Sequence, residues 1–244
     1  MKLLLLAGTG DARRIAQELA TQKDVKTIAS LSGATRNPKP LAVETRHGGF
    51  AEIGGLADYL TTHGFDALLD ATHPFAARMS FQAAQTAREL ALPHVQMLRP
   101  EWEASVADRW TMIASEADAA NHIPSGARVF VATGRKTLEA YDTLADHEVI
   151  CRRIDPPKGP FPLRRGRYIV NRPPFSVADE VRLFRDLGID WLVVKNSGGA
   201  ASRTKLDAAR DLGLPVLMIR RPAQPDCNRV ATVAEALAWV WALR

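Results

Sequence analysis

The chain has 244 residues, of which 46% are hydrophobic and 24% charged, and its formal net charge is +5. These values describe a soluble globular protein of one large or two smaller α/β domains and exclude a disordered chain. Leu3 to Leu6 is too short for a secretory signal, and no stretch approaches the ~20 apolar residues of a membrane span, so we expect a cytoplasmic protein. Cys151 and Cys227 lack a metal-ligand spacing, and two reduced thiols are expected.

Apolar segments alternate with amphipathic segments along the whole chain. The predicted strands are Lys2–Ala7, Val25–Leu31, Ala67–Asp70, His94–Leu98, Arg128–Ala132, Glu148–Arg152, Arg167–Val170, Trp191–Lys195 and Val216–Arg220. The predicted helices, with Ala, Leu and charged residues at a spacing of three to four, are Ala12–Thr21, Ala76–Leu90, Ser176–Leu187 and Ser202–Leu212. This alternation predicts parallel sheets with helical crossovers.

The two halves of the chain resemble each other. Gly64–Asp70 is similar to Gly188–Val194, and Ala87–Pro93 is similar to Ala209–Pro215, at offsets of 122 to 124 residues. The halves also end alike, in a short strand and an Ala-rich helix at Thr111–His122 and Val230–Trp239. Gly10 and Gly134 are also 124 residues apart, and three matches in one register disfavour a chance alignment of α/β units. We predict two similar, duplicated Rossmann-like α/β domains, residues 1–122 and 123–244, with a ligand cleft between them.

A glycine loop follows the first predicted strand, where open parallel sheets bind their ligands. Gly8 and Gly10 permit a tight turn and close phosphate approach, Thr9 offers a hydroxyl, and Asp11 is a good N-cap. Arg13 stands where the third glycine of G-x-G-x-x-G belongs. The loop is compatible with a dinucleotide site and also with a simple glycine turn.

The end of the second predicted strand bears on cofactor choice. In dinucleotide-binding folds this position meets the adenosine ribose, where a carboxylate favours a free 2′-hydroxyl and a basic residue favours a 2′-phosphate. Ser32, Thr35 and Arg36 stand here, without a carboxylate. The segment predicts NADPH over NADH, unless Arg36 is simply solvated.

The predicted strand Ala67–Asp70 ends in Ala71-Thr72-His73-Pro74-Phe75. This loop presents a hydroxyl, an imidazole and an aromatic ring at the ligand edge, with Pro74 fixing the turn. His73 is compatible with three roles: a proton donor, a hydrogen-bond donor to a ligand carboxylate, or a histidine packed on the next helix. Because no second ligand stands at a suitable spacing, no metal site is expected.

The corresponding loops of the second half are basic. Arg135 and Lys136 follow Thr133-Gly134, and the loop Lys195–Gly199 precedes a helix that carries Lys205. Each loop alone is also compatible with a simple glycine turn that carries solvated surface charges. Several basic loops at one sheet edge favour a multiply anionic ligand. Neither half has a Ser-His-Asp set, a Walker lysine loop or a metal cluster. The absence of these sets favours a reaction whose chemistry a bound cofactor supplies.

Taken together, these loops resemble those of the precorrin-6A reductases of cobalamin biosynthesis. The resemblance rests on Gly8–Arg13, Asp70–Ala76, Thr133–Lys136, Lys195–Gly199 and Lys205–Arg210. Ala7 and Asn196 depart from the family pattern, which has glycine and often an acidic residue at these positions. The resemblance implies an NADPH-dependent oxidoreductase that reduces one ring double bond of precorrin-6A, a tetrapyrrole polycarboxylate, to give precorrin-6B.

The resemblance also implies roles for individual residues. The residues expected to bind the cofactor are Gly8, Thr9, Gly10, Asp11, Ala12, Arg13, Ser32, Arg36, Thr72, His73, Pro74 and Phe75. Those expected to hold substrate carboxylates are Thr133, Gly134, Arg135, Lys136, Lys195, Ser197, Gly198, Gly199 and Lys205. Hydride comes from the nicotinamide, and the proton from His73, a lysine or water.

Two alternatives stay open at this point. One is a reductase of another polycarboxylate, and the other is a non-catalytic module that senses NADPH or an anion. Nucleic-acid binding is disfavoured, because the arginine groups occur without an aromatic stacking stripe or a recognition-helix pattern. No membrane partner is expected, and any protein contacts are expected to be transient ones with neighbouring enzymes of the pathway.

Overall fold

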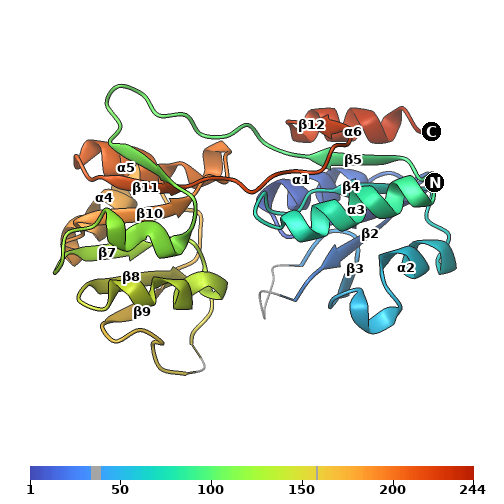
Figure 1. Cartoon of the computed structure of the whole chain (residues 1–244). Coiled ribbons are helices and arrows are strands. Elements are labelled where there is room, and N and C mark those ends of the chain that lie inside the picture. The colour runs from blue at the N-terminus through green and yellow to red at the C-terminus, as the bar shows by residue number, and fades with distance from the viewer. Residues whose placement is uncertain (34–39, 158) are drawn as a thin grey trace. The chain divides into compact units, whose positions relative to one another are not determined.

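The chain folds into two compact units, each built around one parallel sheet (Figure 1). A computed structural model describes residues 1–33, 40–157 and 159–244. The first unit comprises Met1–Pro100 together with Pro222–Arg244, and the second comprises Glu101–Arg221. The chain therefore leaves the first unit after Pro100 and returns to it at Pro222.

The first unit holds a six-stranded sheet in the order β12-β5-β4-β1-β2-β3. Its strands, all paired in parallel, are β1 (Lys2–Leu6), β2 (Lys26–Leu31), β3 (Glu44–His47), β4 (Ala67–Asp70), β5 (His94–Met97) and β12 (Arg229–Val230). Its helices are α1 (Gly10–Leu19), α2 (Leu56–Thr62), α3 (Ala77–Glu89), α6 (Val233–Trp241) and the 3₁₀ helix η1 (Ala51–Ile53).

The second unit repeats this plan with the order β6-β11-β10-β7-β8-β9. Its strands are β6 (Trp110–Ile113), β7 (Arg128–Val131), β8 (Glu148–Arg153), β9 (Gly166–Val170), β10 (Trp191–Lys195) and β11 (Val216–Ile219). Its helices are α4 (Val177–Leu187), α5 (Thr204–Asp211) and the 3₁₀ helices η2 (Glu116–Asn121), η3 (Arg135–Leu144) and η4 (Ala200–Ser202).

With β12 and β6 counted as sixth strands, both sheets have the order 6-5-4-1-2-3 of doubly wound dinucleotide-binding folds. The predicted α/β class with two Rossmann-like parallel sheets is therefore confirmed. The nine predicted strands and four predicted helices are present, with ends that differ by at most two residues.

The sixth strand of each sheet comes from the other half of the sequence repeat. Strand β12 follows the strands of the second unit in sequence but pairs with β5. Strand β6 follows β5 but pairs with β11. The units thus differ in extent from the predicted domains 1–122 and 123–244, because each half of the chain ends on the sheet edge of the other unit.

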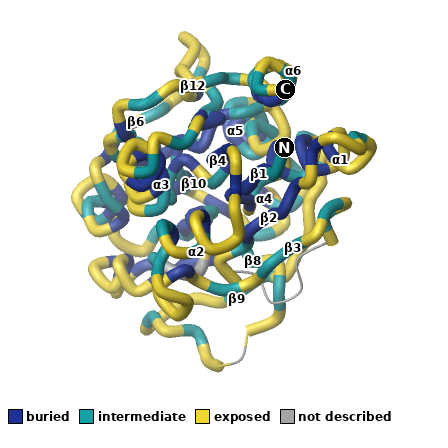
Figure 2. The backbone as a smooth tube through the Cα atoms, turned by 90° about the vertical axis from the view of Figure 1, so that its right-hand side faces the viewer, coloured by how far each residue is buried: buried dark blue, intermediate teal, exposed yellow. Residues whose placement is uncertain are grey.

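Both faces of the first sheet are buried, as expected of a parallel sheet whose strands are apolar throughout. Leu3 and Leu5 point to the face covered by α1 and α6, where they pack in one core cluster with Ile15. Leu4 and Leu6 point to the face covered by α2 and α3. Figure 2 shows the central strands as buried. Because the central strands are apolar on both faces, polar residues occur mainly in the loops that follow them.

Candidate functional site

The first glycine loop turns the chain from β1 into α1. Gly8 has a φ of +134°, which favours glycine, and a Cβ added to Gly8 or Gly10 would meet no atom within 4 Å. Thr9 is the N-cap of α1, because its Oγ1 accepts a hydrogen bond from the Ala12 amide at 3.0 Å. The same hydroxyl donates to the Ala71 carbonyl at 2.9 Å. Thr9 therefore ties the end of β1 to the end of β4, and the space beside the glycines is open.

The structure corrects the predicted capping role of Asp11, since Thr9 is the N-cap. Asp11 is buried in the first turn of α1, where its carboxylate accepts hydrogen bonds from Arg99, at 2.7 Å, and from Arg14. Burial raises the pKa of the Asp11 carboxyl, but the hydrogen bonds from Arg14 and Arg99 outweigh it and leave the pKa lowered. Asp11 therefore holds two guanidinium groups beside the first turn of α1.

The other predicted residues near this loop differ in accessibility. Ala12 is fully buried, so its side chain packs in the core. Arg13 donates from Nη1 to the Pro40 carbonyl at 2.7 Å, and its side chain therefore extends toward the segment that precedes β3. Ser32 is exposed just beyond β2. Arg36 lies outside the described residues.

The loop after β4 holds His73 in a defined orientation. Asp70 Oδ1 accepts a hydrogen bond from the Thr72 amide at 3.0 Å, and His73 Nδ1 accepts one from the Phe75 amide at 3.2 Å. Because Nδ1 is the acceptor, the neutral imidazole carries its proton on Nε2. The His73 ring is exposed, and its centroid lies 5.8 Å from that of Phe75. This loop therefore presents an imidazole N–H donor at the carboxyl end of β4.

The returning segment after Pro222 fixes the same loop. Gln224 Nε2 donates to the Pro74 carbonyl at 2.9 Å, and Gln96 Nε2 donates to Gln224 Oε1 at 2.9 Å. Thr72 Oγ1 lies 3.4 Å from Ser80 Oγ on α3. The loop is thus held by α3, by β5 and by the segment that leads to β12.

The second unit forms its glycine loop between β7 and η3. Gly134 has a φ of +84°, and a Cβ there would meet no atom within 4 Å. The buried Thr133 hydroxyl lies 3.2 Å from the Tyr141 hydroxyl, and burial raises the pKa of the Tyr141 phenol. Arg135 and Lys136 begin η3, but their side chains lie outside the described part of the structure. The two glycine loops therefore differ in backbone conformation, because the positive φ lies at Gly8 in the first and at Gly134, the counterpart of Gly10, in the second. The second loop also has no threonine cap.

Lys195 lies at the end of β10, as predicted, but its charge is paired. Its Nζ lies 2.9 Å from Glu116 Oε1, in an ion pair whose side chains are 16% and 11% exposed. Nζ also donates to the Thr133 carbonyl at 3.2 Å and to Thr137 Oγ1 at 3.3 Å. Burial raises the pKa of the Glu116 carboxyl, but hydrogen bonds from Thr137 and Lys195 outweigh it and lower that pKa. No pattern in the sequence indicates this pair, because Glu116 is remote from Lys195 along the chain.

Asn196 is buried and anchors both points at which the chain enters and leaves the second unit. Its Oδ1 accepts from the Trp102 amide at 2.9 Å, and its Nδ2 donates to the Trp102 carbonyl and to Glu101 Oε2, both at 3.1 Å. Its own carbonyl accepts from Arg221 Nε at 2.7 Å. Asn196 therefore has a structural role in the second unit.

The residues after Asn196 form the second glycine-rich turn. The Ser197 amide donates to the Lys195 carbonyl at 2.7 Å, and Gly198 and Gly199 have φ values of +65° and +83°. The Gly199 carbonyl accepts from Trp102 Nε1 at 3.0 Å. This turn is therefore held against the same segment that Asn196 anchors.

Lys205 is half-buried on α5, and its Nζ lies 5.7 Å from the centroid of the Trp102 ring. Burial, together with the positive charge of Arg152, lowers the pKa of the Lys205 amine to about 8, against the opposing effect of Glu180. Arg152 itself forms two hydrogen bonds with the buried Glu180, at 2.7 and 2.8 Å. Its Nζ donates to the Ser202 carbonyl, and within the described ranges no carboxylate forms an ion pair with Lys205.

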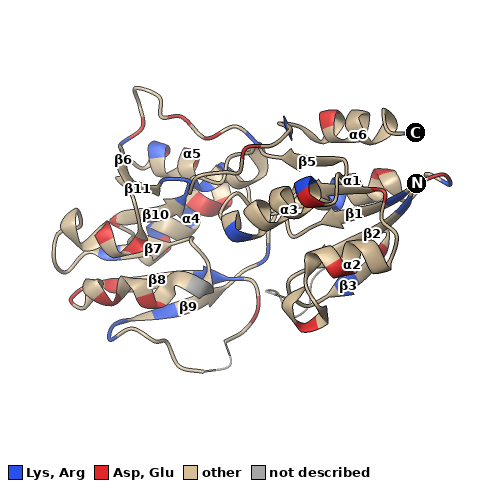
Figure 3. Ribbon diagram, turned by 45° about the vertical axis from the view of Figure 1, so that its right-hand side comes forward, with Lys and Arg blue, Asp and Glu red and all other residues tan. Residues whose placement is uncertain are grey.

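Several cations of the second unit are paired with carboxylates. Figure 3 shows Lys and Arg positions interspersed with Asp and Glu positions. Lys195 is paired with Glu116, Arg152 with Glu180, and Arg210 with Asp108. A multiply anionic ligand would therefore meet fewer unpaired cations than the sequence suggests.

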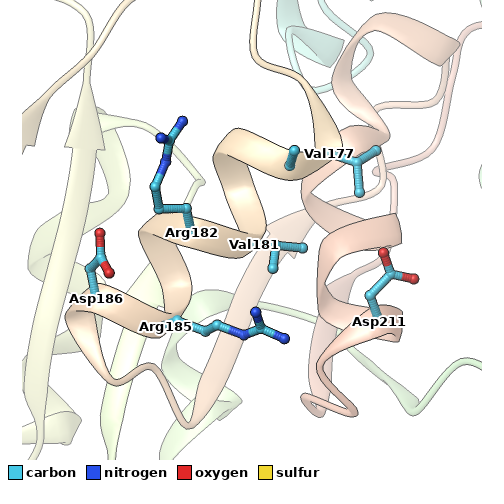
Figure 4. A pocket seen from close by; sticks show the side chains of 7 residues that line it. Val177, Val181, Arg182, Arg185, Asp186 and Asp211 are labelled. Atoms are coloured by element: carbon cyan, nitrogen blue, oxygen red, sulfur yellow. The ribbon is translucent and has the colours of Figure 1, made fainter.

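A pocket in the second unit lies between α4 and the end of α5 (Figure 4). Val177 and Val181 form its apolar part, and Arg182, Arg185 and Asp211 surround them. It contains none of the predicted site residues. Over the described ranges, no group of three or more His, Cys, Asp or Glu is arranged to hold a metal ion. No helix among those residues is long and apolar enough to cross a membrane.

Comparison with known proteins identifies the family. A family described as "Precorrin-6x reductase CbiJ/CobK" matches residues 2–241. A precorrin-6A reductase of Rhodococcus erythropolis is 43% identical over 244 residues, which cover 99% of this chain and 98% of that protein. A cobalt-precorrin-6A reductase of Priestia megaterium is 30% identical over 232 residues, with 90% of each protein covered. A solved structure described as "CobK precorrin-6A reductase" matches with a TM-score of 0.94 at 39% identity, covering 100% of this chain and 97% of that one. The chain therefore belongs to the precorrin-6x reductase (CbiJ/CobK) family.

Proposed function

We propose that the chain reduces one ring double bond of precorrin-6A to give precorrin-6B, with NADPH as the reductant. The observation that carries this proposal is the family match over residues 2–241. The doubly wound sheet of the first unit, with an open glycine turn at the end of β1, supports the use of a dinucleotide. The Rhodococcus protein at 43% identity is named for precorrin-6A and the Priestia protein at 30% for its cobalt complex, which favours the cobalt-free substrate.

The first unit supplies the groups that would hold the cofactor. The open space beside Gly8 and Gly10 admits a phosphate, and the Gly10 and Asp11 amides at the start of α1 have no partner within the helix. Arg99 and Arg14, held by Asp11, add positive charge beside that turn. A bound reduced nicotinamide supplies the hydride.

The second unit supplies the groups that would hold the carboxylates of the substrate. Lys205 is the best described of these, because it is half-buried and sits beside the Trp102 ring. The amides of Gly198 and Gly199 add hydrogen-bond donors. Lys195 acts indirectly, since its pairing with Glu116 fixes the end of β10.

The proton is added to the ring carbon next to the one that receives hydride. Among the described residues, the candidate donors are the His73 imidazole in its protonated form and the Lys205 ammonium, and water is the third source. His73 has a fixed orientation and an exposed ring, whereas Lys205 has a pKa of about 8, near the operating pH of a general acid.

The experiment is an anaerobic assay of reduced-nicotinamide absorbance with precorrin-6A as substrate. We expect absorbance to fall only when precorrin-6A and the protein are both present, with a reduced macrocycle as product. Binding of NADPH without turnover would overturn the reductase and favour a sensing module. Faster turnover of the cobalt complex would overturn the assignment of the cobalt-free substrate.

The same assay separates the proton donors. If protonated His73 donates the proton, His73→Gln lowers the rate at acidic pH, where the imidazolium is populated, and the difference from the wild type shrinks as pH rises. His122→Gln, a change at another exposed histidine, is expected to have no such effect. Near-normal hydride transfer in His73→Gln at all pH values would exclude His73 as the acid.

A further inference from the structure

Strands β2 and β3 end side by side at the carboxyl edge of the first sheet. In their parallel register Ser30 lies opposite Arg46, and Leu31 lies opposite His47. Register partners on neighbouring strands point to the same face, so the Ser30 and Arg46 side chains meet. The last two residues of each strand thus include a cation and an imidazole but no carboxylate.

The Arg46 guanidinium is fixed by contacts on several sides. Nη1 donates to Ser30 Oγ at 2.7 Å, and Nη2 donates to the Gly49 carbonyl at 3.0 Å. The guanidinium carbon lies 4.3 Å from the centroid of the Phe50 ring and 5.1 Å from that of Tyr59. A guanidinium has five N–H donors, and these two bonds use one proton on each terminal nitrogen. The side chain therefore keeps donors for a ligand in a preorganised position.

We propose that Arg46 binds the 2′-phosphate of NADPH and sets the preference of the first unit for NADPH over NADH. The proposal rests on the proposed function, because it takes a nicotinamide dinucleotide as the cofactor. In this fold the adenosine ribose lies at the carboxyl end of the second strand, where an arginine accommodates a 2′-phosphate. The planar fork of arginine matches phosphate oxygens, and the flanking aromatic rings reduce its hydration.

The nearest carboxylate on β3 does not compete for this position. Glu44 stands at the start of β3, where it lies 3.9 Å from Lys26 of β2. The Lys26–Glu44 pair therefore occupies the opposite end of the two strands and offers a matched control. Lys26→Gln removes one positive charge from the same strand pair without touching the carboxyl edge.

The experiment measures the affinities of NADPH, NADH, 2′,5′-ADP and 5′-ADP for the wild-type chain and for Arg46→Gln, Arg46→Lys, Arg36→Gln and Lys26→Gln. Loss of the charged hydrogen bonds from Arg46 predicts an affinity about 10- to 100-fold lower for NADPH and 2′,5′-ADP in Arg46→Gln. The affinities for NADH and 5′-ADP are expected to stay within about threefold, which also reports an intact fold. Lys26→Gln is expected to match the wild type.

Arg46→Lys keeps the charge but loses the fork, and it tests the proposal if Arg46→Gln does not fold. We expect it to weaken NADPH while leaving NADH unchanged. Equal losses for both cofactors in either variant would mean that Arg46 only supports the aromatic cluster, and the proposal would fail. It would also fail if Arg36→Gln alone abolished the preference, or if the wild type bound both cofactors equally. A wild-type chain that bound none of the four nucleotides would overturn the proposed function as well.

Discussion

Asn196 offers the sharpest test of how the second unit is held together. Replacing Asn196 by Ala removes three side-chain hydrogen bonds, two to the backbone of Trp102 and one to Glu101. At about 1 kcal/mol for each bond, the loss is about 3 kcal/mol. The cost is not relieved by water at the Trp102 amide, because Asn196 is 1% exposed and Trp102 is 8% exposed. We therefore expect a large fall in the free energy of unfolding from a change that adds no strain.

Asn196→Asp separates this account from a simple loss of volume. The new carboxylate oxygen would face the Trp102 carbonyl and the Glu101 carboxylate, both acceptors, so the folded state raises the pKa of the introduced carboxyl above its unfolded value. The penalty is then absent when that carboxyl is protonated and grows as pH rises above the unfolded pKa of about 3.9. Adding Glu101→Gln restores a donor and is expected to recover part of the stability.

The assay is urea unfolding at 25 °C followed by tryptophan fluorescence, with the mid-transition and slope measured for each variant. Asn171→Ala, at an exposed asparagine of the same unit, is the matched control and is expected to match the wild type. An Asn196→Ala variant as stable as Asn171→Ala would refute the reasoning. So would an Asn196→Asp variant whose destabilisation is the same at pH 4 and pH 7.

Three further outcomes follow from contacts in the two units. Thr9→Ala is expected to cost about 1–2 kcal/mol in urea unfolding by removing the cap on Ala12 and the bond to Ala71, whereas Thr9→Ser keeps both. A double-mutant cycle of Glu116→Gln and Lys195→Met is expected to give a coupling energy of about 1–3 kcal/mol, because either single change leaves a poorly hydrated polar partner. The pKa of Lys205 is lowered to about 8 in the folded state, so between pH 8 and its ordinary value of 10.5 the unfolded chain binds more protons and wild-type stability rises with pH. Lys205→Met lacks this rise. At pH 7 the variant is expected to have a higher free energy of unfolding than the wild type, because it buries no charged amine, and this difference is expected to shrink by pH 10.

Most of the fold could be predicted from the sequence because its central strands are buried on both faces. Such strands are continuous apolar runs, and Lys2–Leu6 and Trp191–Lys195 are clear for this reason. Strand β3 was missed because Glu44–His47 is polar and lies at the sheet edge, where only part of each side chain is buried. The compact units differ from the predicted domains because similarity between the halves identifies only the repeat. Which sheet strand β6 or β12 joins depends on tertiary pairing, which the repeat does not indicate.

The candidate site was predictable in its loops and less so in its side-chain partners. Turns that need glycine, such as Gly8 and Gly134, follow from the spacing of strand and helix. The pairing of Lys195 with Glu116 and the anchoring by Asn196 depend on contacts between residues remote in sequence. Arg46 was missed as well, because it lies on the edge strand that the sequence pattern did not predict.

The two glycine loops differ in the polar groups that they bond. In the first unit the Thr9 hydroxyl caps α1 and bonds Ala71, and the side of the turn next to the glycines is open. In the second unit Lys195 bonds the Thr133 carbonyl at the corresponding turn, and it brings the carboxylate of Glu116 with it. The Lys195–Glu116 ion pair leaves less positive charge for a pyrophosphate beside this loop. The first loop also leads into an α-helix, α1, whereas the second leads into a 3₁₀ helix, η3. On these grounds we propose that the first unit receives the dinucleotide.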